Sequence, residues 1–395
     1  MTAYESAKAM GYVSLVEKIN AVSLKEYGLC PELLMDKVFR ANEKPEKPFV
    51  YAGLNNADID GALLSLFETD AEKVLDGIEI AGMLTGAAAK FLYLPDWNRE
   101  VVEKVRPLAG KRGIILVNGD IINVREAEND LLLHIATACD LADVASGSYE
   151  PGVYVKVQDA PLKKVAEETP VTELVSVEGA KAVYLGYKYY TPEEAGGLKA
   201  KDATSGLIRV LSEKDCVVDE TAKRLSLDRI QSCGKCVFCR ESLIQFEFMQ
   251  KEITQGRGKA EYLELTKEIG SVMGDSTLCT VGQISAELPL SAIEKFAGEY
   301  DAHIKKNQCP AGVCTSFTHI YIDPKTCTGC GDCLDVCPAD CIEGKPKFIH
   351  MIDEFDCTKC GKCIEACEEG AVMQTSGKLP KLPDRLTKVG KFKKH

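Results

Sequence analysis

A repeated cysteine pattern near the C-terminus constrains this chain more than any other feature. The spacing Cys-x2-Cys-x2-Cys-x3-Cys starts at Cys327 and occurs again, with the same intervals, from Cys357. Three thiolates on one tight loop can bind one iron–sulfur cube, and the fourth thiolate then comes from the other repeat. The pattern therefore predicts two 4Fe-4S clusters. Their ligands are Cys327, Cys330, Cys333 and Cys367 for cluster one, and Cys357, Cys360, Cys363 and Cys337 for cluster two.

Paired zinc binding is the alternative to these two clusters. Zinc knuckles usually combine two CxxC pairs, often with His, whereas two triplets with a crossed fourth ligand fit two cubes. The segment resembles a bacterial-type two-cluster ferredoxin, and Pro338 follows the fourth cysteine of the first repeat as that pattern requires. Cys341 stands where such ferredoxins commonly have Ala, so we interpret it as a packed thiol that is not a ligand.

A third cysteine group lies further upstream. Cys233, Cys236 and Cys239 form one triplet, and Cys279 follows it after an expected helical hairpin. Three clustered thiolates and one distant thiolate predict a third 4Fe-4S cluster. Of the eighteen cysteines, fifteen lie at or after Cys233. In a chain that shows no secretory signal, such clustering indicates metal or cluster binding rather than disulfides.

The residues around these ligands carry a family resemblance. The resemblance rests on three runs: Ser232–Glu241, Leu278-Cys279 and Cys309-Pro-Ala-Gly-Val-Cys314. From about residue 145 to the end, the sequence resembles part of a known flavoprotein. That protein is the NADH-binding flavoprotein subunit of complex I, in the longer form found in soluble, electron-bifurcating iron–iron hydrogenases. The resemblance implies a ubiquitin-like SLBB module around Pro151-Gly-Val-Tyr154 and a helical cluster domain over residues 225–300.

The flavin ligands of this family are not found in the N-terminal half. The family holds FMN and NADH with a Gly-Arg-Gly-Gly-Ala-Gly-Phe-Pro loop, whose backbone amides cradle phosphate. Residues 30–50 contain no glycine at all. A later acidic stretch of the family survives only as Asn56-Ala-Asp-Ile-Asp-Gly61, before a segment, Val74–Gly82, that resembles the family's next helix. We expect a degenerate flavin domain whose scaffold is kept, and no tight FMN binding.

Four of the remaining metal-ligating side chains suggest a zinc site. His303, Cys309 and Cys314 fall within one loop region, and Cys216, just before the helical domain, can close a tetrahedral Cys3His set. The resemblance to hydrogenase subunits supports zinc. A 2Fe-2S cluster is one alternative. In another, His303 caps a helix C-terminus and the cysteines are merely buried or reversibly paired.

Composition excludes two broad classes of function. Lys and Arg number 48 against 60 Asp and Glu, and the net charge of −12 offers no general field for nucleic acid or anionic lipid. The longest apolar stretch, residues 80–89, is shorter than the roughly 20 residues of a membrane span. The N-terminus lacks a basic segment followed by an apolar one, so we expect a cytoplasmic protein without transmembrane segments.

The expected fold class is a multidomain combination of α/β and α+β parts. The predicted strands are Phe49–Gly53, Phe91–Leu94, Gly113–Val117, Gly152–Val157, Ala182–Gly186 and Leu207–Leu211, with a helix over Ala71–Ala89. The predicted domains are an N-terminal helical and linker segment (1–50), a degenerate FMN/NADH-type α/β domain (51–144), an SLBB-like module (145–200), a helical 4Fe-4S domain with the zinc site (201–315), a two-cluster ferredoxin domain (316–376) and a basic tail (377–395). We expect the tail to extend along a neighbouring subunit rather than pack on its own chain.

No catalytic residue is assigned. Asp58 and Asp60 are expected on an exposed turn, as a solvated face or a helix cap. His134 lies in an apolar pattern that we interpret as helical, so it is expected to be a core or boundary histidine. No Ser/His/Asp set or Walker loop is present.

The predicted function is an electron-transfer subunit of an anaerobic multi-subunit oxidoreductase, a carrier rather than an independent catalyst. Three 4Fe-4S clusters would relay single electrons between a partner's flavin or cluster and a second redox subunit or soluble ferredoxin. The resemblance implies partners such as a flavoprotein, a 2Fe-2S thioredoxin-like subunit, a hydrogenase or a formate dehydrogenase. Two alternatives stay open: an FMN-containing NADH-oxidising subunit, and a docking paralogue whose clusters are redox-silent.

Overall fold

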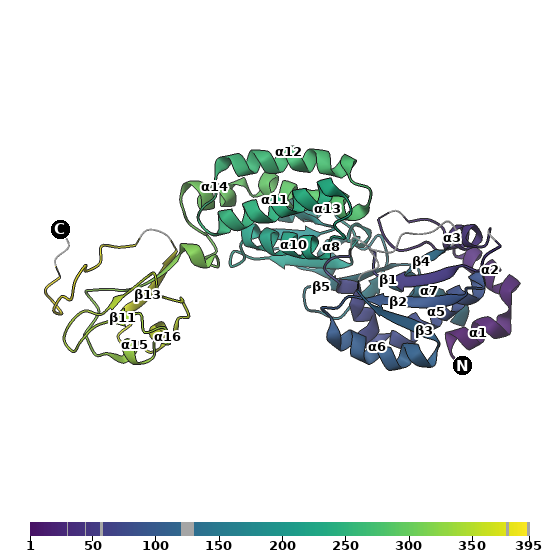
Figure 1. Ribbon diagram of the computed structural model, residues 1–395, viewed down its shortest axis with the longest axis horizontal. Helices are drawn as coiled ribbons and strands as arrows, with labels where there is room; N and C mark the ends of the chain where they lie inside the picture. Colours follow the sequence, from purple (N-terminus) through teal and green to yellow (C-terminus); the bar gives the residue numbers. More distant parts are fainter. Residues whose placement is uncertain (30, 44, 56–57, 120–129, 377–378, 393–395) are drawn as a thin grey trace. The chain divides into compact units, whose positions relative to one another are not determined.

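The computed structural model describes the chain except for residues 30, 44, 56–57, 120–129, 377–378 and 393–395 (Figure 1). The chain divides into two compact units. The first contains residues 1–210, 224–244 and 267–291, and the second contains residues 211–223, 245–266 and 292–395.

The first unit begins with a four-stranded parallel sheet in the order β3-β2-β1-β4. The strands are β1 (Phe49–Gly53), β2 (Ala89–Leu94), β3 (Ile114–Asn118) and β4 (Leu131–His134). Alternate residues such as Val50, Leu92 and Leu133 are buried on one face. This burial holds the register, because a slip by one residue would turn these side chains to the opposite face. The predicted strands at Phe49–Gly53, Phe91–Leu94 and Gly113–Val117 are observed to within two residues.

Three helices and the N-terminal segment build the core of this sheet domain. Helices α5 (Ala71–Thr85), α6 (Arg99–Lys111) and α7 (Ile135–Ser146) pack with α1 (Ala3–Met10), α2 (Tyr12–Ala21) and α3 (Leu34–Ala41) in one hydrophobic cluster. Residues 1–50 therefore have no core of their own. Helices α5 and α7 cross closely, because a Cβ at Gly77 would lie 1.8 Å from the Ala138 carbonyl oxygen. Only glycine permits this approach.

The expectation that His134 lies within a helix is wrong. Leu131–His134 is strand β4, which pairs in parallel with β1, and α7 begins only at Ile135. A short apolar run gives the same signal for a buried strand and a buried helix, and here pairing with β1 decides. The other expectation for this residue is confirmed, because His134 is 1% exposed.

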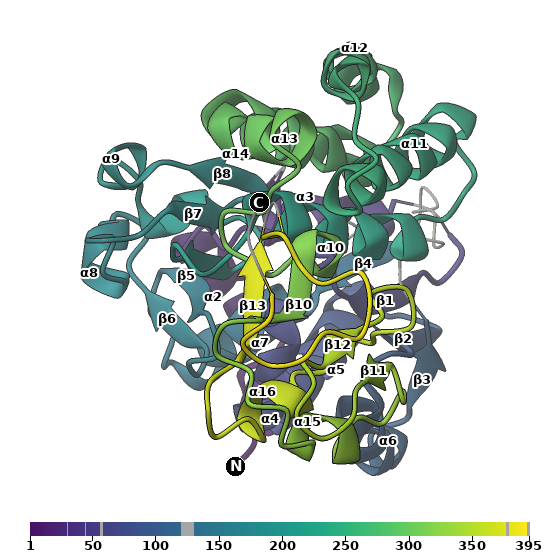
Figure 2. The same ribbon diagram turned by 90° about the vertical axis from the view of Figure 1, so that its left-hand side faces the viewer.

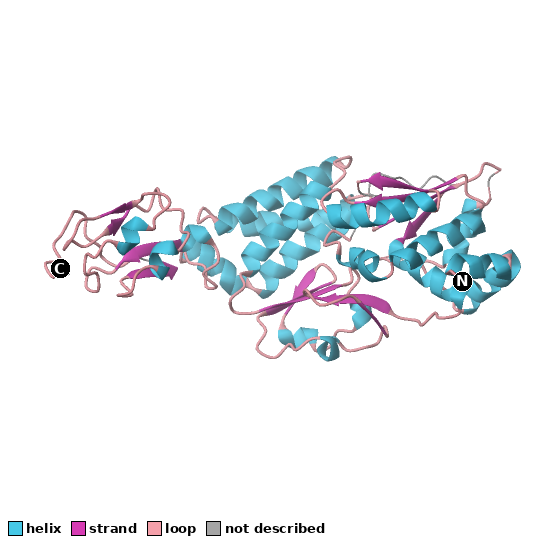
Figure 3. Cartoon of the chain, turned by 90° about the horizontal axis from the view of Figure 1, so that it is seen from below, coloured by secondary structure: helices cyan, strands magenta, loops and turns pink. Residues whose placement is uncertain are grey.

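A second sheet completes the α+β part of this unit; its strands are magenta in Figure 3. It has five strands, in the order β6-β5-β9-β7-β8. The strands are β5 (Val153–Val157), β6 (Lys163–Val165), β7 (Ala182–Leu185), β8 (Lys188–Tyr190) and β9 (Leu207–Leu211), with short helices α8 (Val171–Leu174) and α9 (Pro192–Ala195). β5 and β9 are parallel, whereas the β5–β6 and β7–β8 pairs are antiparallel. The strand at Leu207–Leu211 has the predicted bounds and belongs to this sheet.

Five helices follow the second sheet, as the amphipathic spacing predicts. They are α10 (Val217–Gln231), α11 (Val237–Thr254), α12 (Ala260–Ser276), α13 (Thr280–Lys295) and α14 (Ala297–Lys305). Helices α10 to α13 each continue from one unit into the other. Among the described residues, no helix has the length and apolar character needed to cross a bilayer.

The two cysteine repeats form a small, nearly symmetric β-rich body within the second unit. β10 (Thr318–Ile322) pairs antiparallel with β13 (Val372–Ser376), and β11 (Ile342–Glu343) pairs with β12 (Met351–Ile352). A one-turn helix follows the second cysteine in each repeat, α15 (Asp332–Asp335) and α16 (Lys362–Glu365). Each helix starts after a left-handed glycine, Gly331 or Gly361.

The prediction that the tail extends along a neighbouring subunit is wrong for its described residues, 379–392. The tail folds back along the second-unit body (Figure 2). The Ile349 amide donates to the Thr387 carbonyl (2.8 Å), and the Val389 amide donates to the Lys347 carbonyl (3.1 Å). Phe392 packs against the hydrophobic core of the repeats. This apolar contact and these backbone bonds favour packing on the chain itself.

Candidate iron–sulfur and metal sites

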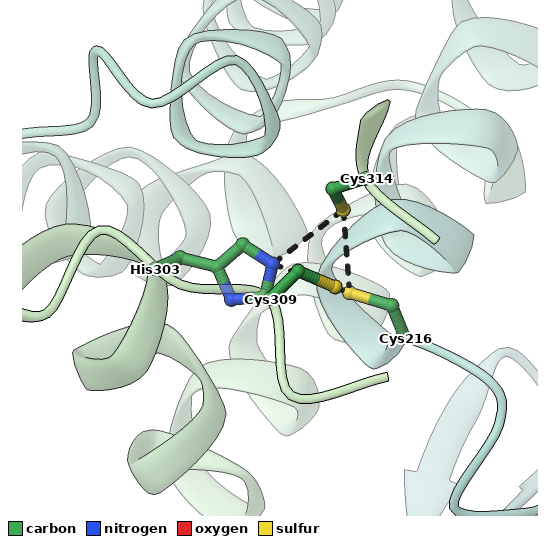
Figure 4. Close-up of side chains that lie close together, drawn as sticks. All are labelled: Cys216, His303, Cys309 and Cys314. Atoms are coloured by element: carbon green, nitrogen blue, oxygen red, sulfur yellow. Dashed lines mark hydrogen bonds between the residues drawn. The ribbon is translucent and has the colours of Figure 1, made fainter. Parts of the chain in front are cut away.

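Four buried donor atoms converge where α10 begins and α14 ends (Figure 4). The Cys216 sulfur lies 3.4 Å from Nε2 of His303 and 3.7 Å from the Cys314 sulfur. The Cys314 sulfur lies 3.5 Å from the same Nε2, and with the Cys309 sulfur all four atoms lie within 4.8 Å of one another. Tetrahedral zinc with ligands at about 2.0 to 2.3 Å separates its donors by about 3.6 to 3.8 Å. The spacing therefore fits one tetrahedral ion.

Neighbouring groups hold the imidazole of His303 in the orientation a metal needs. Nδ1 of His303 lies 2.8 Å from the Glu299 carbonyl oxygen, one turn earlier on α14. If Nδ1–H donates there, Nε2 is left with a free lone pair that points at the sulfurs. The Glu299 carboxylate accepts from the Val217 amide (2.9 Å), which fixes the start of α10 beside Cys216. Phe317 packs edge-on against the imidazole with 5.1 Å between the ring centres.

The same four groups are strongly coupled as acids. Hydrogen bonds from the Cys216 and Cys314 thiols hold the pKa of Cys309 well below its usual range. The contact with Cys309 is the largest cause that raises the pKa of Cys216. Burial lowers the pKa of His303, but hydrogen bonds to Cys309 and to the Glu299 backbone outweigh it and raise that pKa. These hydrogen bonds favour negative charge on the buried Cys309 sulfur, and a cation held by the four donors would balance that charge.

The structure brings the predicted ligands of cluster two together around a hollow of about 290 Å³. Cys337, Cys357, Cys360 and Cys363 all line it, although Cys337 comes from the other repeat. Burial and the charges of Cys357, Cys360 and Cys337 raise the pKa of Cys363. Cys341 also lines the hollow, is 5% exposed, and has its sulfur 3.5 Å from that of Cys337. The fifth thiol is thus packed beside a predicted ligand.

The predicted ligands of cluster one are grouped in the same crossed way. Burial raises the pKa of Cys333 to about 12, and the charges of Cys327, Cys330 and Cys367 add to the rise. Cys367 belongs to the second repeat and is close enough to act on Cys333; the crossed ligand set of cluster one stays a prediction. Cys330 is exposed, whereas Cys327 and Cys333 are buried.

The third predicted quartet is also assembled, within the first unit. Burial raises the pKa of Cys239 to about 11, and the charges of Cys279, Cys236 and Cys233 contribute further. Cys279 stands at the start of α13, 40 residues after Cys239, and reaches the triplet through the α11–α12 hairpin. Low exposure of Cys239 (6%) and partial exposure of the other three place the site at the surface of its unit.

Lys359 is a site residue that sequence reasoning missed. It lies between two predicted ligands of cluster two, and its Nζ donates to the carbonyl oxygen of Thr315 (2.7 Å), directly after Cys314. Its φ of 58° is left-handed, at the position where the first repeat has Gly329 with φ of 74°. A comparison of the two repeats could have indicated Lys359, because a lysine at a left-handed position costs more backbone energy than the glycine of the first repeat. Such a lysine suggests that its side chain has a role.

The carboxyl edge of the N-terminal sheet is filled by the chain itself. In open α/β sheets, ligands bind outside the carboxyl ends of strands where the strand order reverses, here between β1 and β4. At this point the Glu26 carboxylate accepts from the His134 amide (2.6 Å), and the Tyr27 ring stacks on the imidazole, 4.8 Å between centres. The Asn55 side chain donates to the Tyr27 carbonyl (2.7 Å). Glu26 and Tyr27 lie more than 100 residues before His134, so the sequence alone did not indicate these contacts.

The expectation that Asp58 and Asp60 lie on a solvated turn is wrong. Asp58 is 4% exposed and accepts from Nε2 of His134 (2.8 Å), whose Nδ1 accepts from the Ala136 amide. Asp60 is nearly buried and pairs with Arg224, whose guanidinium lies over the Tyr184 ring. Partners distant in sequence account for this burial: His134 gives Asp58 a hydrogen-bond donor, and Arg224 gives Asp60 an opposite charge.

Comparisons with known proteins agree with the cysteine sites. Residues 221–303, which contain the third quartet, match the NADH-ubiquinone oxidoreductase-F iron–sulfur binding region. Residues 319–371, which contain the ligands of clusters one and two, match the 4Fe-4S dicluster domain. The chain therefore carries both kinds of iron–sulfur domain, as the resemblance predicted.

Relatives are found among subunits of multi-subunit redox enzymes. The NADP-reducing hydrogenase subunit HndC of Solidesulfovibrio fructosivorans is 38% identical over 37% of this chain and 30% of its own length. The mitochondrial NADH-ubiquinone oxidoreductase 51 kDa subunit of Neurospora crassa is 30% identical over 27% of this chain and 22% of its own length. The matches thus span less than a third of either relative.

Structures of an NAD+-reducing NiFe hydrogenase in the H2-reduced and air-oxidised states share the fold, with TM-scores of 0.61 and 0.64. Sequence identity is 14% and 15%, over 76% of this chain and 64% of theirs.

Proposed function

We propose that this chain is an iron–sulfur electron-transfer subunit of a multi-subunit oxidoreductase, in which three 4Fe-4S clusters relay single electrons between partner subunits. The observation that carries the proposal is the assembly of three cysteine quartets, two of them crossed between repeats. The names of the relatives, subunits of a hydrogenase and of NADH-ubiquinone oxidoreductase, support other redox subunits as partners.

Bound clusters would accept and release one electron at a time, and the residues around them would set the energy of that step. The Lys359 amide donates to the Cys357 sulfur (3.4 Å), and the Ala371 amide donates to the Cys367 sulfur (3.2 Å). Such N–H···S bonds stabilise the more negative, reduced state and so raise a cluster's reduction potential. Two backbone amides at the second repeat would therefore tune one ligand of each proposed cluster, Cys357 of cluster two and Cys367 of cluster one.

The filled sheet edge supports a relay without its own flavin. The Glu26 carboxylate accepts from the His134 amide, directly before α7 begins, and so occupies a position where a phosphate could bind. Tyr27 covers the His134 ring beside it, and a Cβ at Gly28 would lie 2.1 Å from the Asn55 side chain. FMN in this position would have to displace a packed loop. NADH oxidation is accordingly assigned to a partner.

The buried Cys3His quartet is proposed to hold a structural zinc ion. Its four donors surround one point and are all provided by the protein, which is typical of structural rather than catalytic zinc. A 2Fe-2S cluster needs two pairs of ligands around two irons, whereas these four atoms are mutually close. Bound zinc would join the start of α10 to the loop that leads into β10.

The direct test counts iron, zinc and flavin on one anaerobically purified sample. Three cubes give about twelve irons per chain, with one zinc and no flavin. Replacing Cys233 by Ser should lower iron to about eight and stop transfer through the assembly, whereas Cys139→Ala, a buried thiol outside every quartet, should leave both unchanged. Full transfer in the Cys233 variant would refute the relay. One flavin per chain would instead make this the NADH-oxidising subunit.

A further inference from the structure

The tail extends a basic surface on the ferredoxin-like body. Residues 316–376 carry eleven acidic side chains and five lysines. Two of these lysines, Lys345 and Lys347, precede the segment on which the tail packs, and the tail adds Lys388 and Lys391. The bridge between Phe348 and Lys388 and the bond from the Val389 amide to the Lys347 carbonyl hold the two segments together. These four lysines are called the basic strip.

The charges of the basic strip face solvent. All four side chains are exposed, and within the part of the chain that the structure describes none of their ammonium groups forms an ion pair with a carboxylate. The Lys345 ammonium instead lies over the Phe348 ring, 4.3 Å from its centre. Lysines that served only to neutralise this acidic body would be expected beside its carboxylates. Their positive field is therefore directed outward.

The basic strip lies beside cluster one. The Lys347 amide donates to the carbonyl of Gly329 (3.3 Å), which stands between the predicted ligands Cys327 and Cys330. A Cβ at Gly329 would lie 2.7 Å from the Phe348 carbonyl oxygen, so the two segments touch. Cys330 itself is exposed. The predicted ligand Cys360 of cluster two is exposed as well, but it follows Lys359, whose ammonium group donates to the carbonyl oxygen of Thr315.

We propose that the basic strip docks a small, acidic, ferredoxin-type one-electron carrier over cluster one. Electron-transfer encounters are small, and charge complementarity speeds and orients them, whereas obligate subunit interfaces are larger and more apolar. The exposed lysines and exposed cluster ligand fit the first kind of partner. The exchange moves one electron between the carrier's cluster and cluster one, and no atom is transferred. The inference rests on the proposed relay function.

Binding tests the proposal directly. The probe is a dye-labelled acidic two-cluster ferredoxin, and its Kd for the full, cluster-loaded chain is measured by fluorescence anisotropy at several ionic strengths. The K345E/K347E/K388E/K391E variant should raise Kd at least about tenfold at low salt. A matched variant with four exposed lysines of the first unit reversed, K18E/K47E/K111E/K163E, changes net charge equally and should shift Kd less than about twofold.

Three results would overturn the docking site: no binding by the wild type, binding that does not weaken with salt, or equal weakening in both variants. Should the charge-reversed variant lose iron, K345Q/K347Q/K388Q/K391Q replaces it, and its Kd should still rise more than that of the matched glutamine control. Methyl viologen, a cationic mediator, reports on the relay separately. If viologen exchanges electrons with every variant while ferredoxin binding is unaffected, the docking site fails and the relay stands. If viologen exchanges no electrons even with the wild type, the relay fails.

Discussion

Removing one donor of the Cys3His quartet is the sharpest test of the proposed zinc site. We consider Cys216→Ala, because Cys216 is the only donor outside the α14 loop region. Its sulfur lies 3.4 Å from His303 Nε2 and 3.7 Å from the Cys314 sulfur, both within about 0.2 Å of a tetrahedral zinc edge. Structural zinc binds with about 10 to 16 kcal/mol shared over four ligands. The loss of one ligand should cost about 3 kcal/mol, or about a hundredfold in affinity.

The assay is zinc competition against a chromophoric chelator of known affinity, with zinc per chain counted on the same samples. Cys139→Ala makes the same chemical change at an equally buried thiol and should leave zinc affinity unaltered. If Cys216→Ala bound zinc as tightly as the wild type, the four-donor geometry would not be a zinc site. Iron above about twelve per chain and no zinc would instead support a 2Fe-2S cluster there.

Acid should weaken this zinc site steeply. The hydrogen bond to Cys309 is the largest cause that raises the pKa of Cys216. For Cys314, a hydrogen bond from Cys216 lowers the pKa, but the bond to Cys309 and burial outweigh it and raise the pKa. Both are therefore thiols near neutral pH, and zinc must displace at least two protons. Affinity should fall at least about a hundredfold for each unit of pH decrease, measured in the same competition assay. If zinc affinity fell only tenfold or less for each unit of pH, at most one proton would be displaced, and this would contradict the prediction.

Two further predictions concern stability. Burial raises the pKa of Asp228 to about 7, above its value in the unfolded chain. Protonated Asp228 therefore stabilises the fold at low pH, and this stability is lost as pH rises from about 4 to 7. Across this window the free energy of unfolding of Asp228→Asn, measured with urea, should rise by up to about 4 kcal/mol relative to wild type, and a constant difference would refute the argument. Gly77→Ala should lower the free energy of unfolding by at least about 1 to 3 kcal/mol, because its Cβ would lie 1.8 Å from the Ala138 carbonyl oxygen. The control Gly110→Ala on α6 has open space around its Cβ and should stabilise the chain by up to about 1 kcal/mol. Similar effects at both sites would contradict the close crossing of α5 and α7.

Sequence reasoning reached the sites whose ligands are local or repeated. The triplet spacing predicts cluster ligands because three thiolates on one loop already define most of a cube, and the second repeat supplies the fourth. Cys216 could be proposed only by elimination and resemblance, since 87 residues separate it from His303. Its grouping with the other donors is visible only in the folded chain.

The errors came from groups whose surroundings are distant in sequence. Asp58 and Asp60 looked like a solvated turn, but His134 donates a hydrogen bond to Asp58 and Arg224 forms an ion pair with Asp60. His134 itself was placed in a helix because periodicity cannot separate a buried strand from a buried helix over four residues. The tail looked like an arm for a partner because charge and proline content say nothing about which surface a segment covers.

The sequence by itself determined the chemistry of the cluster ligands, the fold class of the strands and helices, and the acidic balance of the chain. These properties follow from residue type and spacing within short segments. Tertiary structure alone decided three things: that Glu26 and Tyr27 fill the sheet edge, that Lys359 reaches the carbonyl oxygen of Thr315, and that the tail packs on residues 347–349, which contact Gly329. Each depends on contacts between segments far apart along the chain, and such contacts are set by how the whole core packs.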